Sequence, residues 1–174
     1  MPPRTRTTHG SEVPEAFREA FGRDHQDALG YHGNALTLRS EGSCASVVFN
    51  VASIALERYL LALCALHGVE PRECTLGSLA REAADGANSR RARGGGFPES
   101  LVRAVQELES AFDICSLESS GDTEPGPPDA ERALALCDLV AGFCPGPGLG
   151  HGSGRGGGCG GPGPRSGGCE VAQC

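Results

Sequence analysis

The sequence contains no lysine, and all 15 of its basic residues are arginines. Acidic residues outnumber them, because the chain has 22 Asp and Glu and a net charge of −7 at pH 7. Residues 10–142 hold 21 of these acidic residues against 11 arginines, so this part alone carries −10. Because nucleic acids are bound through many contacts from Lys and Arg to phosphates, the composition excludes generic nucleic-acid binding over the whole surface.

The chain also lacks an apolar stretch near its start that could serve as a secretory signal. We therefore expect it in the reducing cytoplasm, where structural disulfides are uncommon. None of its 9 cysteines forms a C-x-x-C pair. Five cysteines fall at apolar helical positions, where we expect them to pack as small hydrophobic side chains. They are Cys44, Cys64, Cys115, Cys137 and Cys144.

The longest apolar run, residues 44–67, predicts the central helix of the fold. At about 100° per residue, four of its polar residues fall on one narrow wedge, which reads as the solvated strip of the helix. They are Ser46, Asn50, Ser53 and Glu57. The rest of the circumference is apolar apart from Arg58, so we expect other helices to cover it. A membrane span is the alternative, but the polar wedge and Arg58 would be costly in lipid.

The rest of the pattern is helical, and no segment alternates as a strand does. We predict further helices over about 14–38, 76–84, 98–115 and 129–143, although Gly22, Gly30 and Gly33 disfavour one unbroken first helix. Ser43 and Thr75 are the predicted caps of the two helices that follow them, and Gly68 is the predicted stop of the central helix. Residues 85–97 read as a polar loop, and the last helix is expected to bury Phe143.

The predicted fold is therefore all-α, an up-and-down bundle of four to five helices. We expect a disordered N-terminus at 1–11, a helical domain at 12–144 and a low-complexity tail rich in Gly, Pro and Cys at 145–174.

The segment ASIALERYLLALCALHG, residues 52–68, resembles the second helix of HEPN-domain proteins. The matching positions are Ala55, Glu57, Arg58, Leu60, Leu61 and Leu63. The context is similar as well, with ALTLRSEG before this helix and TLGSLAREA after it, then a helix ending AFDICSLE, an acidic Pro/Gly loop and a last helix. The resemblance covers about residues 15–143.

The resemblance implies a helical bundle that forms a homodimer or pairs with a heterologous protein, such as a nucleotidyltransferase-type partner. Catalytic HEPN proteins are metal-independent ribonucleases that use an Arg and a His a few residues apart near the last two helices. Residues 98–144 contain no His, and their arginines are Arg103 and Arg132 alone. AFDICSLESS also lacks the Arg and Tyr that often end this helix in the family. We therefore predict a non-catalytic interaction module without a cofactor; a ribonuclease with a relocated site is an alternative.

Arg58 is the first candidate binding residue, because it projects among Val47, Val51 and Ala65, where an unpaired charge would be costly. Either it pairs with an acidic residue of another helix, which we favour, or this side of the helix lies at a partner interface. Asn50 and Glu57 are candidates on the neighbouring wedge.

A second group of candidates is the arginine cluster around the predicted loop, which would favour a nucleotide or RNA site on charge alone. Its members are Arg81, Arg90, Arg91 and Arg93. The Arg-Gly-Gly-Gly segments at Arg93 and Arg155 lack the interleaved aromatic residues on which bases stack, so nucleic-acid binding has no independent support.

A third alternative is a metal- or redox-responsive protein that uses the tail. Thiolates and imidazole are ligands for soft metals. The candidate ligands are Cys144, His151, Cys159, Cys169 and Cys174. Their spacing is unlike that of zinc fingers, and closing such Gly-rich loops has a large entropic cost. A dedicated metal site is therefore disfavoured.

Overall fold

The computed structural model describes residues 13–89, 96–112 and 124–145, and this part of the chain consists of five helices without a strand. They are α1 (Glu15–Ser40), α2 (Ala45–Leu66), α3 (Leu76–Ser89), α4 (Glu99–Phe112) and α5 (Pro127–Ala141). The predicted all-α bundle is confirmed. The predicted disordered N-terminus and the predicted tail lie outside the described residues.

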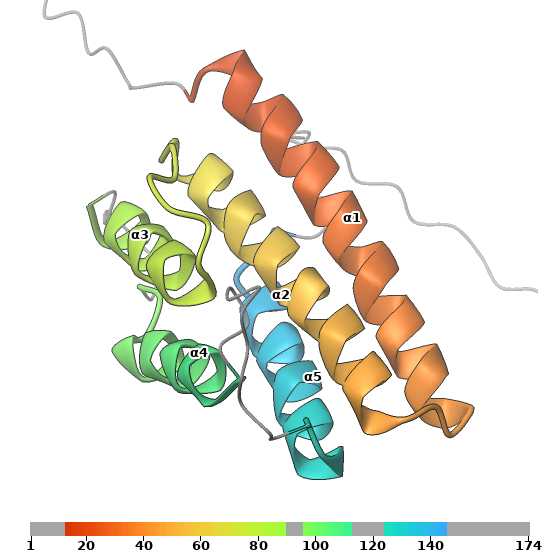
Figure 1. The fold of residues 1–174 in the computed structure, drawn as a ribbon. Coiled ribbons are helices and arrows are strands. Elements are labelled where there is room, and N and C mark those ends of the chain that lie inside the picture. Colours follow the sequence, from red (N-terminus) through yellow and green to blue (C-terminus); the bar gives the residue numbers. More distant parts are fainter. Residues whose placement is uncertain (1–12, 90–95, 113–123, 146–174) are drawn as a thin grey trace, which may run out of the picture.

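Helix α2 is the centre of the bundle, as its sequence predicts. Helix α1 runs along one side of it, α3 and α4 lie on the other side, and α5 lies behind it (Figure 1). The largest buried side chains of α2 are Phe49, Leu56, Tyr59 and Leu60, which are at most 2% exposed. By length and composition α2 would also cross a bilayer, but 61% of its apolar window is buried inside the bundle, as in the core helix of a soluble fold.

Helix α1 is continuous through its three glycines, which the sequence disfavours. A Cβ atom added at Gly22, Gly30 or Gly33 would meet no atom within 4 Å, so these residues lie in open space. The opposite face of the helix buries Ala28 and Ala35 fully. We infer that this packing against α2 outweighs the cost of about 1 kcal/mol for each glycine in a helix.

The ends of α2 differ from each other. Gly68 has a φ of 63° and ends the helix as predicted, with the Val69 N–H donating to the Cys64 carbonyl at 2.8 Å. At the other end the predicted cap is wrong: Cys44 occupies the cap position and no side chain caps the helix. Cys44 is consequently exposed rather than packed.

Helix α3 extends further than predicted, because residues 85–89 are helical rather than part of a loop. Gly86 permits a close approach to the end of α2, since a Cβ atom there would lie 2.7 Å from Val69 Cγ2. Thr75 caps the helix as predicted and accepts a hydrogen bond from the Ser78 N–H at 3.2 Å. Glu109 of α4 accepts two more, from the Leu76 and Gly77 N–H groups at 2.9 and 3.0 Å.

Other packing predictions have mixed outcomes. Cys64 and Cys137 are buried and Cys144 is half-buried, as expected, whereas Cys115 lies outside the described residues. Phe143 was expected in the core but is 36% exposed, because it follows the end of α5. Its ring lies against that of Phe97, with 5.0 Å between the ring centres.

Candidate interaction site

Helix α2 has one row of side chains that the other described helices cover only in part; Ala65, at the end of this row, is 5% exposed and therefore buried. We call this row the α2 stripe. It consists of Val47, Val51, Ile54, Arg58, Leu61 and Ala65. The spacing of 4, 3, 4, 3 and 4 residues is that of a coiled-coil seam. Val47 and Ile54 are 41% and 39% exposed, and Val51 and Leu61 are half-buried.

The stripe stays open because the neighbours of α2 occupy its other sides. The Cys137 thiol of α5 donates to the Ala52 carbonyl, and the Cys64 thiol donates to the Leu79 carbonyl of α3. On the α1 side, Tyr59 lies against His32. The stripe faces away from these three contacts, and Val47 and Ile54 remain exposed on this side of the helix.

Arg58, within the stripe, forms the ion pair that its apolar surroundings predict. Its Nη1 lies 3.4 Å from Oδ1 of Asp24 on α1, and the Asp24 side chain is only 8% exposed. Arg23 also reaches this carboxylate, with Nη2 3.5 Å from Oδ2. Arg58 Nε is buried and has no hydrogen-bond partner among the described residues. The pair therefore neutralises Arg58 and leaves part of its guanidinium unsatisfied.

A groove of about 510 Å³ adjoins this ion pair, between the first turns of α1 and the end of α2. Its walls are mostly apolar, and its other lining residues include Arg23, Asp24 and Arg58. The apolar lining consists of Ala16, Phe17, Ala20, Leu61, Ala65, Val69 and Pro71. Because Leu61 and Ala65 belong to the α2 stripe, the stripe and the groove form one continuous surface.

Tyr31 extends the surface onto α1. It lies seven residues after Asp24, so the two side chains project from the same side of the helix, two turns apart. Helix α1 runs antiparallel to α2, and its Asp24 side contacts Arg58. Tyr31, which is 39% exposed, therefore flanks the middle of the α2 stripe.

The polar wedge is solvated only in part. Asn50 is exposed and Glu57 is partly exposed, but Ser53 is 6% exposed and its hydroxyl has no partner among the described residues. Cys64 lies five turns from Ser46 along the same line and packs on α3. One member of the wedge, Ser53, is therefore buried, and the other three remain at least partly exposed.

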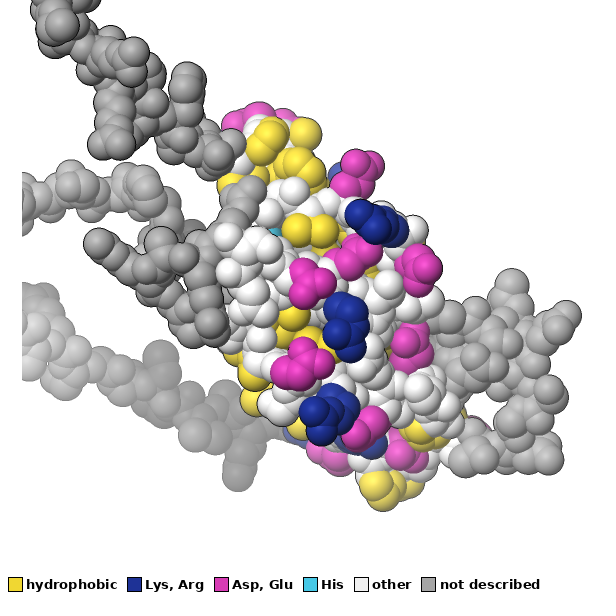
Figure 2. All heavy atoms as spheres, turned by 90° about the vertical axis from the view of Figure 1, so that its left-hand side faces the viewer, with side chains coloured by type: hydrophobic (Ala, Val, Ile, Leu, Met, Phe, Trp, Pro, Cys, Tyr) yellow, Lys and Arg dark blue, Asp and Glu magenta, His cyan; other side chains and the backbone are white. Residues whose placement is uncertain are grey.

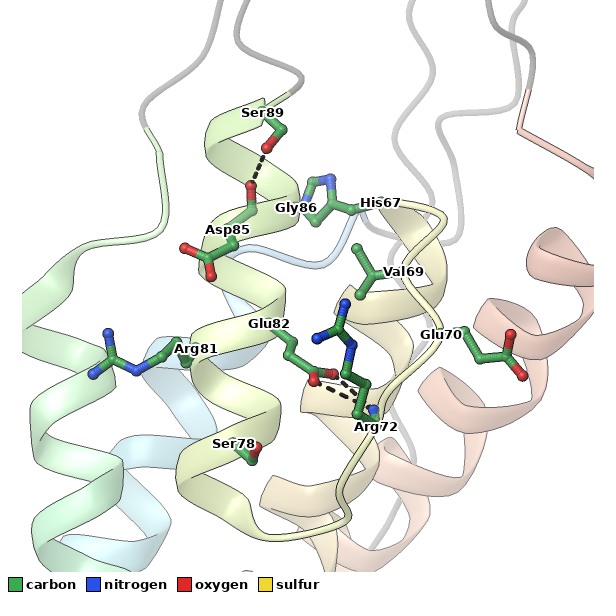
Figure 3. A pocket seen from close by; sticks show the side chains of 10 residues that line it. All are labelled: His67, Val69, Glu70, Arg72, Ser78, Arg81, Glu82, Asp85, Gly86 and Ser89. Carbon is green, nitrogen blue, oxygen red and sulfur yellow. Dashed lines mark hydrogen bonds between the residues drawn. The ribbon is translucent and has the colours of Figure 1, made fainter.

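The arginine cluster is only partly described. A hollow of about 520 Å³ lies between α3 and the connection from α2 (Figure 3). Arg81 points away from it towards α4, with Nη2 3.8 Å from Glu99 Oε1. Within it, the Arg72 N–H donates to both carboxylate oxygens of Glu82, at 3.2 and 3.3 Å. Arg90, Arg91 and Arg93 lie outside the described residues.

The surface of α3 and α4 is mixed in charge. Figure 2 shows Arg side chains alternating with Asp and Glu side chains down this face, with no extended area of positive charge. Such alternation offers no continuous path for a phosphate backbone. On the side of the molecule that Figure 2 shows, the described surface thus gives no support to a nucleic-acid interface.

A buried contact between His32 of α1 and Tyr59 of α2, which the sequence did not reveal, lies beside the exposed Asp138 of α5. His32 Nδ1 lies 3.3 Å from the Tyr59 hydroxyl, and His32 Nε2 lies 3.6 Å from Asp138 Oδ1. Tyr59 is fully buried, and burial raises its pKa to about 12. Because the Tyr59 phenol is fully buried, no ligand can reach it from solvent. The contact therefore joins helices and does not form an open site.

The described residues contain no group of three or more potential metal ligands. Of the tail candidates only Cys144 is described; it packs against the core, and burial raises the pKa of its thiol to about 12. His151, Cys159, Cys169 and Cys174 lie outside the described residues.

Comparison of the chain with family models, with curated proteins and with solved structures finds no match.

Proposed function

We propose that the chain is a non-catalytic interaction module that binds a helical surface of a protein partner through the α2 stripe, the adjoining groove and Tyr31. The observation that carries the proposal is the partly exposed 4-3 row on an otherwise buried core helix, in which Val47 and Ile54 are 41% and 39% exposed. Scattered exposed apolar residues are normal, but a contiguous row marks an interaction surface.

The composition of this surface supports the proposal. Arg and Tyr are enriched at the centres of protein interfaces, and here Arg58 and Tyr31 lie beside Ile54. A partner helix inserted along the stripe would place its side chains between those of α2, as helices do in coiled coils. The resemblance to HEPN proteins, which associate through helix faces, agrees with this role.

The chemistry of the last two helices supports a role without catalysis. Arg132 donates to Glu107 at 2.7 Å and Arg103 is exposed, and neither has a histidine nearby in sequence. General acid–base cleavage of RNA requires a proton acceptor close to the cation that stabilises the phosphate. Cleavage of RNA by the purified chain, abolished by a single substitution, would contradict this part of the proposal.

Photo-crosslinking tests the docking surface even while the identity of the partner is open. The full chain is expressed in its native cells with benzoylphenylalanine in place of Ile54, or in place of Leu139 on α5 as a control. Leu139 is 58% exposed, more than Ile54 at 39%, so exposure alone favours the control. We expect covalent protein adducts at position 54 in clear excess over position 139. Equal or absent labelling at position 54 would refute the proposal.

A further inference from the structure

We propose that the segment that docks on the α2 stripe and the adjoining groove is a basic amphipathic helix, with an apolar row flanked by Lys or Arg. This inference rests on the proposed function and names the chemistry of its partner. Three observations carry it: acidic side chains without ion-pair partners on the rim of the surface, arginines that are already paired, and an aromatic ring beside one of the acidic residues.

Three carboxylates on the rim of this surface form no ion pair with a described residue. They are Asp27 of α1, Glu57 of α2 and Glu70 in the connection after α2. Asp27 and Glu70 are exposed, and Glu57 is partly exposed. Glu70 lines the groove, and Figure 3 shows its side chain directed away from α3. A partner that covers these carboxylates removes their water, so it must supply cations to them.

The two arginines of the surface do not offset these carboxylates, because both already contact Asp24. Arg58 Nη1 lies 3.4 Å from Asp24 Oδ1, and Arg23 Nη2 lies 3.5 Å from Asp24 Oδ2. Counted with the buried Asp24, the surface carries four acidic residues against two arginines, which leaves a charge of −2. The surface is therefore an apolar centre with an acidic rim.

The acidic residues lie on both edges of the α2 stripe. Tyr59, one residue after Arg58, lies against His32 and marks the α1 edge. Glu57, one residue before Arg58, points about 100° to the other side and so flanks the edge away from α1. A helix that lies along the stripe meets a carboxylate on each side. Charges that flank an apolar seam in this way select the partner in coiled coils.

Asp27 and Tyr31 form a site for one cation of the docked helix on the α1 edge. Asp27 follows Asp24, the partner of Arg58, by three residues, and Tyr31 follows Asp27 by four. Side chains at these spacings lie on the same side of a helix. Tyr31 is 39% exposed, so its ring is accessible. A Lys or Arg placed there pairs with the Asp27 carboxylate and packs on the ring, whose face attracts cations.

The excess of acidic residues disfavours the other occupants. A second copy would bring the same acidic rim, and the domain behind it holds 21 acidic residues against 11 arginines between residues 10 and 142. Nucleic acids present phosphates and are repelled in the same way. The basic run of this chain, residues 90–93, has no apolar row to lie along the stripe. A basic helix is attracted instead, and Lys and Arg also cover apolar edges with their aliphatic stems.

Peptide binding to the full chain is the first test. The probe is a fluorescein-labelled helical peptide of about 18 residues, long enough at about 1.5 Å per residue to follow the stripe from Val47 to Leu61. It carries Leu in a 4-3 row flanked by Lys. A second peptide has Glu in place of every Lys, and a third has the composition of the first in scrambled order. By fluorescence anisotropy at about 0.1 M salt, the Lys-flanked peptide should bind at least about tenfold more tightly than either of the others.

Two triple variants separate the rim from the net charge of the chain. The first neutralises the three rim carboxylates and should weaken binding of the Lys-flanked peptide by about tenfold. The second removes the same charge from exposed positions of α3 and α4 and should change this affinity by less than about twofold. Circular dichroism confirms that both remain folded. Equal effects of the two variants, or equal binding of the Lys-flanked and Glu-flanked peptides, would overturn the inference. The variants are Asp27→Asn, Glu57→Gln and Glu70→Gln, and Asp85→Asn, Glu99→Gln and Glu107→Gln.

The second test separates this inference from the proposed function. The adduct that benzoylphenylalanine at position 54 forms in cells is digested, and the crosslinked segment is identified by mass spectrometry. A basic amphipathic stretch supports both the docking function and the inference. An acidic or neutral segment, including α2 of a second copy, leaves the docking function standing and overturns the inference. If position 54 labels no protein, the docking function fails and the inference fails with it.

Discussion

Helices α3 and α4 bury most of their apolar faces within the chain, whereas α2 leaves Val47 and Ile54 exposed. The apolar residues of α3 and α4 point into the bundle, and their outer surface carries alternating acidic and basic side chains (Figure 2). The start of α3 is capped twice, by Thr75 and by Glu109. Helix α2 starts without a side-chain cap and exposes Val47 and Ile54.

This difference follows from the amount of apolar surface that each helix carries. An amphipathic helix needs one neighbour to bury its single stripe. A helix that is apolar nearly all round needs neighbours on every side, and α2 is in contact with α1, α3 and α5. The described helices therefore leave part of one side of α2 without a neighbour. The proposed function assigns this place to a helix of the partner.

Two side chains of α2, one buried and one exposed, should give the largest difference in the free energy of unfolding. Leu56 is fully buried, whereas Ile54, two residues earlier, is 39% exposed. Leu56→Ala should lower the free energy of unfolding by about 2–5 kcal/mol, because it leaves a cavity in the core. Ile54→Ala should cost the monomer less than about 1 kcal/mol. Urea unfolding followed by circular dichroism, at concentrations at which the chain is monomeric, measures both. Similar losses would mean that the stripe is covered within a single copy.

The double cap of α3 is the next test. Glu109→Ala removes the carboxylate that accepts hydrogen bonds from the Leu76 and Gly77 N–H groups. We expect a loss of about 1.5–3 kcal/mol, the range for hydrogen bonds to a charged group. Glu107→Ala, on the same helix, breaks an exposed ion pair with Arg132 and should cost at most about 1 kcal/mol. Equal losses in urea unfolding would show that the cap contributes nothing beyond surface charge.

Two glycines should respond to alanine with opposite signs. At Gly86 a Cβ atom would lie 2.7 Å from Val69 Cγ2 and 2.9 Å from His67 Cβ, so Gly86→Ala should destabilise by about 1–3 kcal/mol. At Gly30 it would meet nothing within 4 Å, and Gly30→Ala should stabilise by about 0.5–1 kcal/mol, because alanine favours the helix. Thermal unfolding of both variants checks the signs. A stabilising Gly86→Ala would refute the close packing of α3 on the end of α2.

These contrasts also show what the sequence can predict. Local spacing predicted the central helix and the apolar face of α3. The cost of an unpaired buried charge predicted that Arg58 pairs with an acidic residue. The identity of that partner, Asp24, depends on how α1 lies against α2, which spacing does not fix. The burial of Ser53 and the exposure of Ile54 likewise depend on how the helices pack, which spacing does not fix.

The helix boundaries failed for a related reason. Glycine at 86 is typical of a loop, yet it lies within α3. A larger side chain there would collide with Val69, so the glycine serves the packing of the helix. Ser43 reads as a cap, yet Cys44 takes that position and no side-chain bond forms. In both cases tertiary packing decided between local alternatives of similar energy. His32, Tyr59 and Asp138 come from three different helices, so no single stretch of sequence predicts that they lie close together.

The cysteines provide the smallest test, because their chemistry reports which surfaces are open. The Ser46 hydroxyl and the Val47 N–H lower the pKa of the exposed Cys44 thiol below its ordinary value of 9. Burial raises the pKa of Cys64 and Cys137 to about 12. The thiolate is the reactive form, so iodoacetamide at pH 7.5 should modify Cys44 and spare the two buried thiols until urea unfolds the chain.

The pH dependence of this labelling follows from the same shift. A lowered pKa means that thiolate appears at lower pH, so the Cys44 rate should reach half its maximum below pH 9. Ser46→Ala removes the largest cause of the lowered Cys44 pKa and should slow labelling at pH 7.5. Peptide mass spectrometry follows each site. A Ser46→Ala rate equal to that of the parent chain would show that the Ser46 hydroxyl does not stabilise the Cys44 thiolate.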